Sequence, residues 1–171
     1  KQWPIGYFAE LALRLVERGE EVWVLGSAGE RPLGDLIRRE TRGAAHNLCG
    51  QTGLGDVVDL VAAVRAVVTN DSGLMHVAAA AGAHVVAIYG SSSPAFTPPL
   101  TGRRSIHYLA LDCSPCFRRE CPLGHLRCLR DITVDAVLAS MSSNMEVPRT
   151  LTSTYLSTRY IDCPVPVSAA R

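Results

Sequence analysis

An acid, a hydroxyl, a glycine and a histidine gather where a predicted strand gives way to a predicted helix. Asp71, Ser72 and Gly73 follow the β-branched stretch AVVTN, and His76 comes one turn later. Asp and Ser are favoured at the start of a helix, and glycine lets a ligand approach the backbone closely. Free amides and the positive end of the helix dipole would suit a diphosphate. The same residues also fit a simple helix cap with His76 packed on the sheet, and these four residues leave both interpretations open.

Four cysteines form a second group that could do chemistry. Within residues 112–130, Cys113 and Cys116 have the spacing C-x2-C, and Cys121 and Cys128 follow at wider intervals. Four thiolates can bind a structural zinc ion, although the second pair lacks the short spacing of common zinc sites. The alternatives are therefore a zinc or interaction module and a surface loop with free thiols. The arginines of this segment fit either a solvated basic loop or recognition of carboxylates and phosphates.

Alternating helices and strands must position both groups. Helices are predicted at residues 6–19, 31–40, 54–65 and 133–141 and from the turn at Asp71–Gly73 onward. Strands are predicted at residues 21–27, 46–50, 66–70, 84–90 and 105–111. This alternation indicates βαβ units, so the expected fold class is α/β, a Rossmann-like doubly wound parallel sheet. Ligands of such sheets bind outside the carboxyl ends of the strands, where Asp71–Gly73 would lie.

Composition limits the classes of function. The chain has 171 residues and a formal net charge of +1, which gives no electrostatic reason to expect a nucleic-acid partner. No apolar stretch approaches the roughly 20 residues of a membrane span, and the start lacks the apolar core of a signal peptide, so we expect a cytoplasmic protein. Residues 142–171 are rich in Ser, Thr and Pro and are expected to form a disordered or unrelated tail.

A longer stretch points to a family. The segment VVTNDSGLMHVAAAAGAHVVAIYGSSSPAFTPP resembles the nucleotide-sugar site of the heptosyltransferases that build the inner core of lipopolysaccharide. KQWP, LGSAGE and LCGQTGLGDVVDLVAAV are similar to further segments of that family, in the same order and spacing. The resemblance implies the two-domain GT-B architecture, of which this chain is the C-terminal half. Residues 1–141 would then be an ADP-heptose-binding domain that is truncated at its N-terminus.

The resemblance also implies roles for single residues. Lys1 would contact the donor diphosphate, Glu30 would lie near the nucleoside, and a third group would line the diphosphate and sugar site. This third group comprises Asp71, Ser72, Gly73, Leu74 and His76. A lysine can neutralise a leaving phosphate, and a carboxylate can accept hydrogen bonds from ribose hydroxyls. No catalytic residue is expected in this chain, because the proton-accepting aspartate of the family belongs to the missing N-terminal domain.

The implied reaction is the inverting, metal-independent transfer of heptose from ADP-L-glycero-D-manno-heptose to the inner core, without a cofactor. The partners would be the lipid A-core acceptor, the missing N-terminal domain and, by way of the acceptor, the inner face of the inner membrane. Other GT-B enzymes and some sugar-nucleotide epimerases share the strand, glycine turn and helix, so they remain alternatives. A nicotinamide-binding domain is disfavoured because Gly50, Gly53 and Gly55 give G-x-x-G-x-G instead of G-x-G-x-x-G.

The resemblance makes a further prediction about the sheet. In the strand order 3-2-1-4-5-6, the first strand lies in the middle, between the strands predicted at 21–27 and 66–70. In the family that central strand comes just before K-x-W-P, the segment with which this chain begins. We therefore expect a gap of one strand in the sheet, no transfer activity from this chain alone and a weak cooperative melting transition.

Overall fold

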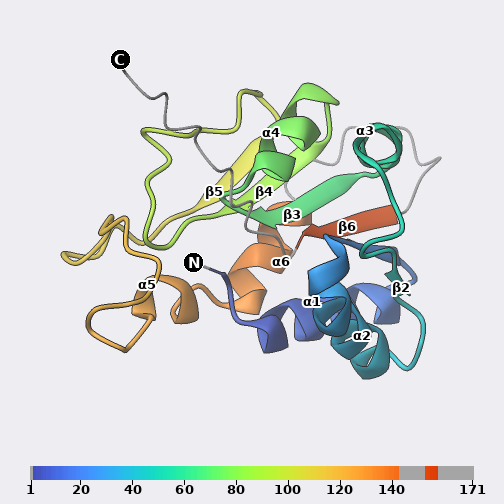
Figure 1. The fold of residues 1–171 in the computed structure, drawn as a ribbon, viewed down its shortest axis with the longest axis horizontal. Helices are drawn as coiled ribbons and strands as arrows, with labels where there is room; N and C mark the ends of the chain where they lie inside the picture. The colour runs from blue at the N-terminus through green and yellow to red at the C-terminus, as the bar shows by residue number, and fades with distance from the viewer. Residues whose placement is uncertain (1, 143–152, 158–171) are drawn as a thin grey trace, which may run out of the picture.

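The computed structural model describes residues 2–142 and 153–157. Helices and strands alternate along most of this length, and the helices lie on both faces of a single sheet (Figure 1). This arrangement confirms the predicted α/β class. No helix within the described ranges is both long enough and apolar enough to cross a bilayer.

The predicted elements form, with shifts of a few residues at their ends. The helices are α1 (Ile5–Glu17), α2 (Arg31–Glu40), α3 (Leu54–Ala63), α4 (Gly73–Ala80), α5 (Arg127–Arg130) and α6 (Val134–Ser142), and the 3-10 turn η1 (Ala28–Glu30) precedes α2. The strands are β1 (Glu21–Leu25), β2 (His46–Asn47), β3 (Ala66–Asn70), β4 (His84–Ile88), β5 (Arg104–His107) and β6 (Ser153–Ser157). The short helix α5 lies within residues 112–130, which the sequence predicts to be a loop.

The sheet has the strand order β2-β1-β6-β3-β4-β5, and each neighbouring pair is parallel. The carboxyl ends of these strands therefore meet at one edge. At this edge Asn70 of β3 is paired with Ile88 of β4, so the loops that follow both strands begin side by side. Such an edge is the usual place for a ligand in an open parallel sheet.

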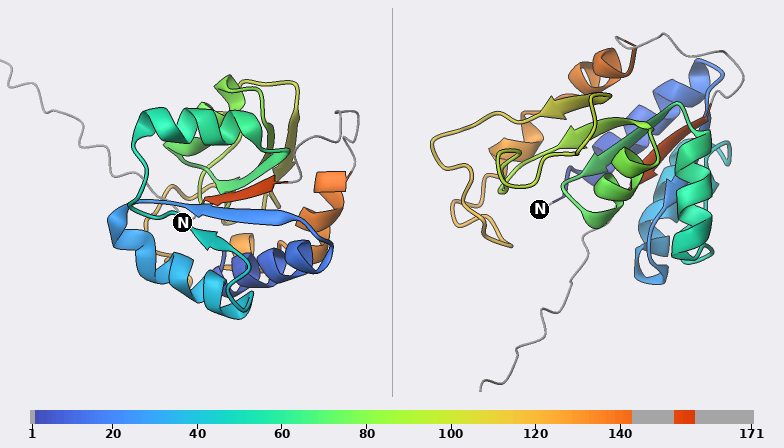
Figure 2. Two further views of the ribbon diagram at one scale, coloured as in Figure 1. Left: turned by 90° about the vertical axis from the view of Figure 1, so that its right-hand side faces the viewer. Right: turned by 90° about the horizontal axis from the view of Figure 1, so that it is seen from above.

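The middle of the sheet differs from the prediction. β6 lies between β1 and β3 (Figure 2), with Thr154 paired with Val22 on one side and with Ala66 on the other. The predicted gap is therefore wrong among the described strands, because β6 provides partners for the inner edges of both neighbours. Of the two alternatives for residues 142–171, a disordered or an unrelated tail, disorder does not hold at Ser142, which ends α6, or at Ser153–Ser157, which form β6. The other residues of that prediction, 143–152 and 158–171, lie outside the described part of the chain.

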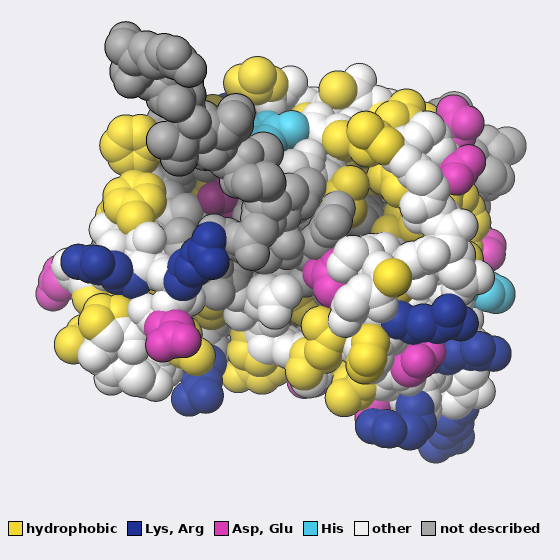
Figure 3. All heavy atoms as spheres, in the orientation of Figure 1, with side chains coloured by type: hydrophobic (Ala, Val, Ile, Leu, Met, Phe, Trp, Pro, Cys, Tyr) yellow, Lys and Arg dark blue, Asp and Glu magenta, His cyan; other side chains and the backbone are white. Residues whose placement is uncertain are grey.

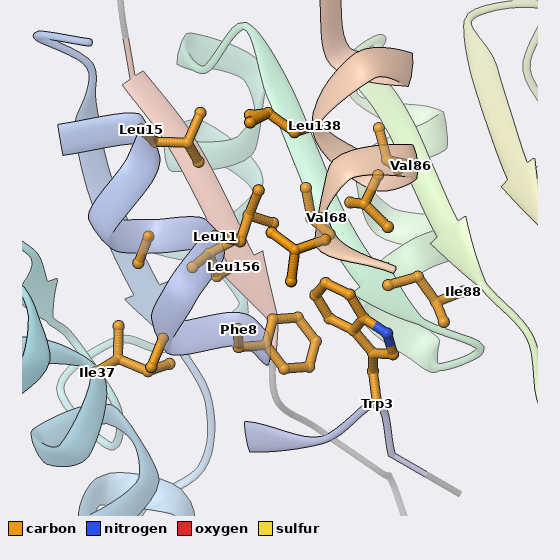
Figure 4. Close-up of a cluster of buried hydrophobic side chains, with 14 of the residues drawn as sticks. Trp3, Phe8, Leu11, Leu15, Ile37, Val68, Val86, Ile88, Leu138 and Leu156 are labelled. Carbon is orange, nitrogen blue, oxygen red and sulfur yellow. The ribbon is translucent and has the colours of Figure 1, made fainter. Parts of the chain in front are cut away.

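A hydrophobic core lies on each face of the sheet, between the strands and the helices that cover them. Helices α1, α2 and α6 cover one face, and α3 and α4 cover the other. Successive residues of a strand point to opposite faces, so Val68 packs into the first core and Val67 into the second. Leu156 of β6 is fully buried in the first core, near Leu11 and Phe8 of α1 (Figure 4). Strands buried on both faces explain the nearly continuous apolar runs in the sequence.

Trp3 fixes the N-terminal segment to the carboxyl edge of the sheet. Its indole is only 1% exposed and packs edge-to-face on Phe8, with ring centroids 5.0 Å apart. Its Nε1–H donates to the carbonyl oxygen of Ile132 over 2.9 Å. Its backbone N–H donates to Oδ1 of Asn70, also over 2.9 Å. The start of the chain therefore lies next to the end of β3, immediately before Asp71.

Candidate functional site

A cleft of about 220 Å³ lies beyond the carboxyl ends of β3 and β4. Its walls come from the turn before α4, from the loop after β4 and from the segment that carries the cysteines. The lining residues are Asp71, Ile88, Gly90, Ser92, Phe96, Thr97 and Phe117. A mixed lining of this kind, apolar with a few polar groups, is typical of small-molecule sites.

The N-terminus of α4 adjoins this cleft. Ser72 holds the N-cap position with an extended backbone, but its side chain makes no capping hydrogen bond within the described structure. Its hydroxyl instead lies 3.2 Å from Oγ1 of Thr69, and the side chain is buried. The next residue, Gly73, is exposed and begins the helix. The simple-cap interpretation is therefore wrong for Ser72, and the first turn of α4 keeps backbone amides for an anion.

Hydrogen bonds hold the carboxylate of Asp71 at the edge of the cleft. Thr97 donates from its hydroxyl to Oδ1 of Asp71 over 3.1 Å. The carbonyl oxygen of Thr97 in turn accepts a 2.5 Å hydrogen bond from the hydroxyl of Tyr89, which also lies 3.3 Å from Sδ of Met75. Burial raises the pKa of Tyr89, and the nearby charge of Asp71 raises it further. Tyr89 therefore remains a neutral hydrogen-bond donor that fixes the loop above α4.

Asn70 is a functional candidate that the sequence pattern did not reveal. The residue is 1% exposed, and its Oδ1 is occupied by the backbone N–H of Trp3. Its Nδ2 is buried and has no hydrogen-bond partner within the described structure. An unpaired buried donor is costly, and this one lies directly before Asp71. It is therefore available to an acceptor atom at this end of β3.

Leu74 and His76 lie on α4 after Gly73, outside the lining of the cleft. Leu74 is 6% exposed and packs into the core between α4 and the sheet, so only its backbone could reach an anion. His76 is exposed on the helix, and neither side chain belongs to the lining of the cleft. Of the five residues predicted around this turn, only Asp71 lines the cleft. Ser72 and Gly73 follow it directly at the N-terminus of α4, and the side chains of Leu74 and His76 point elsewhere.

Glu30 lies in a different loop. Its Oε2 accepts hydrogen bonds from both the backbone N–H and the hydroxyl of Ser27, each over 2.7 Å, and so stabilises the turn after β1. β1 and β3 are separated by β6, which places their axes about 10 Å apart at ordinary strand spacing. Lys1 is outside the described residues.

Six of the seven lining residues had no role predicted from the sequence, all except Asp71. Ser92, Phe96 and Thr97 come from the loop after β4, and Phe117 comes from the cysteine segment. Phe96 and Phe117 form an edge-to-face pair at 5.6 Å and are 75% and 52% exposed. The stretch GSSSPAFTPP, directly after a buried strand, could have indicated a binding loop that contains Ser92, Phe96 and Thr97. No local pattern indicated Phe117.

The cysteine segment packs on the loop after β4. The hydroxyl of Ser114 donates to the carbonyl oxygen of Gly90, and the backbone N–H of Phe117 donates to the carbonyl oxygen of Ser91 over 2.7 Å. Gly90 lies so close to Leu129 that a Cβ atom there would be 2.5 Å from the leucine Cγ. In the orientation of Figure 1, basic and hydrophobic side chains are interspersed over this part of the surface (Figure 3). One wall of the cleft therefore depends on residues 112–130.

Comparison with known proteins connects this chain and its fold with glycosyltransferases. Glycosyltransferase family 9 (heptosyltransferase) matches residues 1–127. Lipopolysaccharide heptosyltransferase 2 of Escherichia coli K12 is 40% identical over 147 residues, which cover 84% of this chain and 42% of that protein. Lipooligosaccharide heptosyltransferase 2 of Haemophilus influenzae is 46% identical over 110 residues, 62% of this chain and 32% of that protein. The chain thus spans less than half the length of these relatives.

Solved structures agree with these sequence matches. The structure of E. coli ADP-heptose LPS heptosyltransferase II aligns with a TM-score of 0.70 at 40% identity and covers 81% of this chain and 40% of that one. A family 9 glycosyl transferase from Veillonella parvula has a TM-score of 0.70 at 22% identity and supports the fold alone. These matches favour a glycosyltransferase over the epimerase and interaction-module alternatives. The chain belongs to glycosyltransferase family 9, the heptosyltransferase family.

Proposed function

We propose that this chain is the donor-binding part of a heptosyltransferase and that it binds ADP-L-glycero-D-manno-heptose. The observation that carries the proposal is the open N-terminus of α4 beside the cleft. In this proposal the amides of Gly73 and Leu74 bind the diphosphate, and the helix dipole stabilises its charge. The buried Nδ2 of Asn70 offers another donor at the same edge.

The proposed reaction is an inverting transfer to the inner core of lipopolysaccharide. A hydroxyl of the acceptor attacks the anomeric carbon, the bond from that carbon to the diphosphate breaks, and a carboxylate takes the hydroxyl proton. The amides of α4 and the charge of Lys1 would stabilise the departing ADP, which is why we propose no metal ion at the donor site. The acceptor would bring the reaction to the cytoplasmic face of the inner membrane.

Asp71 is a poor choice for the proton acceptor of this reaction. Its carboxylate already accepts the hydrogen bond from Thr97 and lies beside the N-terminus of α4, where it would face the diphosphate. We therefore assign Asp71 to positioning and the catalytic base to the N-terminal domain that the family resemblance implies. His76 and Lys1 would act on the outer side of the diphosphate.

Calorimetric titration of ADP into the 171-residue chain tests the donor site. His76→Ala and Lys1→Ala each remove a proposed contact, and Ser72→Ala removes the hydroxyl at the N-cap of α4 that holds its first turn against Thr69. We expect at least two of the three variants to weaken binding. Loss of a charge-assisted contact costs about 1.5–3 kcal/mol, or about 10- to 150-fold in affinity. His46→Ala and Arg38→Ala remove exposed side chains of similar kinds elsewhere and serve as controls. Unchanged affinity in all three test variants would refute the site.

Transfer itself is tested by mass spectrometry with ADP-heptose and a core acceptor. We expect product when this chain is joined to the N-terminal domain of its full-length protein, and none from residues 1–171 alone. Turnover by the present chain without that domain would contradict the assignment of the base.

A further inference from the structure

Four thiols and an imidazole surround a small cavity in the segment that forms one wall of the cleft. The cavity measures about 30 Å³, which is the space of one water molecule or one ion. The side chains with metal-binding atoms in its lining are Cys113, Cys116, Cys121, Cys128 and His125. All four cysteines that the sequence analysis singled out therefore converge, although their spacing along the chain is irregular.

The turn after Cys121 is tight. The backbone N–H of Gly124 donates to the carbonyl oxygen of Cys121 over 3.1 Å, and Gly124 has φ +68°. The turn C-P-L-G-H therefore brings His125 back to the cavity that Cys121 lines.

Cys128 reaches the same cavity from a different element. It lies on α5 and is 9% exposed, and it lines the cavity together with Cys113, Cys116 and Cys121. Four sulfur atoms around a space of this size match the number of ligands in a tetrahedral zinc site.

A separate observation comes from Ser91. This residue lines the same cavity and is 8% exposed, and its Oγ has no hydrogen-bond partner within the described structure. A buried hydroxyl without a partner is expensive, but it can donate to a thiolate that has a metal ion on its other side. The arginines 118 and 119 also line the cavity and would offset the net negative charge of four thiolates around a divalent cation.

We propose that Cys113, Cys116, Cys121 and Cys128 bind one Zn²⁺ ion, at a site separate from the proposed donor cleft and behind one of its walls. In the present structure all four are free thiols, and no three of the described His, Cys, Asp and Glu side chains are already placed as a metal-binding group. Tetrahedral Zn–S bonds of about 2.3 Å require sulfur atoms about 3.8 Å apart, so the thiols must rotate into the cavity on binding. Thiolate ligands select zinc over magnesium or calcium.

His125 is the less suitable ligand. Its Nδ1 accepts a hydrogen bond from the backbone N–H of Arg127 over 3.0 Å. One ring nitrogen is therefore already directed at the start of α5, which favours four sulfur ligands over a set that includes this imidazole.

The ion would stabilise the wall of the cleft rather than take part in transfer. Phe117, directly after Cys116, lines the cleft, and its backbone N–H is bonded to the carbonyl of Ser91. An ion that joins Cys116 to Cys128 would connect this wall to α5 and so to the core around Leu129. Its removal should loosen residues 112–130 and leave the fold of the sheet intact.

The test is the metal content of the 171-residue chain, purified under reducing conditions and dialysed. We expect about one zinc ion per chain by mass spectrometry, and strong near-ultraviolet thiolate-to-cobalt absorption after replacement with Co²⁺. Cys121→Ser and Cys128→Ser should each lose most of the zinc. Cys49→Ser is the matched control, because Cys49 is also buried and free but lies outside the cavity, and it should retain the zinc.

Chelation supplies a second readout that does not depend on the variants. We expect removal of zinc to speed proteolysis within residues 112–130, and added zinc to restore resistance. A metal-free chain with no cobalt absorption would overturn the proposal, even if the variants fail to fold. Bound iron with sulfide, or disulfides among the four cysteines under the same reducing conditions, would overturn it as well.

Discussion

The hydroxyl of Thr97 donates a hydrogen bond to Oδ1 of Asp71 over 3.1 Å, and this contact joins the loop after β4 to the turn before α4. The hydroxyl of Tyr89 donates to the carbonyl oxygen of Thr97 and so fixes the same loop. The carboxylate of Asp71 is thereby kept beside the N-terminus of α4 without capping it. The position that the carboxylate leaves open is the one that we assign to the diphosphate.

Thr97→Val should weaken ADP binding. Valine keeps the shape of threonine but removes the hydroxyl, so the carboxylate of Asp71 becomes free to occupy the helix N-terminus and compete with the diphosphate. A net hydrogen-bond loss of about 0.5–1.5 kcal/mol corresponds to a decrease of about 2- to 10-fold in calorimetric affinity. Thr101→Val, whose hydroxyl accepts from the backbone N–H of Arg103, is the control. Equal affinity in the two variants would show that the contact has no part in binding.

Gly90→Ala should destabilise the chain through a steric clash. A Cβ atom at residue 90 would lie 2.5 Å from Cγ of Leu129, a branch point that cannot move without disturbing α5. Overpacking of this kind costs about 1–3 kcal/mol in the free energy of unfolding, measured by urea denaturation. Gly102→Ala meets nothing within 4 Å and should change little. The double variant Gly90→Ala, Leu129→Ala should remove the clash, and a lack of any such coupling would contradict this explanation.

Leu156→Ala should destabilise the chain strongly, because the leucine of β6 is fully buried between the sheet and α1. Truncation of a buried leucine costs about 2–5 kcal/mol. Leu100→Ala removes the same atoms at a residue that is 81% exposed, and its effect should stay within about 0.5 kcal/mol. Similar denaturation midpoints for the two variants would mean that β6 does not belong to the sheet in solution.

Two histidines should make the chain less stable in mild acid. Burial lowers the pKa of His84, with further lowering by the charges of Arg103 and Arg65, and burial alone lowers the pKa of His107. Below the ordinary pKa of about 6.5 the unfolded chain therefore binds protons that the folded chain does not. Stability is full above this pH and falls as the pH decreases toward the folded-state values.

Urea denaturation at about pH 7.5 and about pH 5.5 measures this effect. His84→Gln and His107→Gln should each flatten the pH dependence, since glutamine does not titrate. His46→Gln, at an exposed position, should leave it unchanged. A pH dependence that is the same in all of these variants would assign the effect to other groups.

Much of the fold could be predicted because the long helices carry a helical period of apolar residues and the central strands are nearly continuous apolar runs. The run HVVAIYG predicted β4 in this way, and NDSG predicted the turn at α4. β6 could not be predicted, because STYLS is short and lies in a polar neighbourhood, and it is a strand through pairing with β1 and β3. Phe117 and Thr97 reach the cleft from loops that only the tertiary structure brings together.

The position of β6 also affects the tendency of the chain to aggregate. Among the described residues, β2-β1 and β3-β4-β5 would form two partial sheets without β6, each with an unpaired inner edge. Exposed strand edges pair readily with other chains, and contacts between distant parts of a sequence form slowly. Residues 1–152 alone should therefore aggregate more readily than the 171-residue chain, because the five residues of β6 cover both edges.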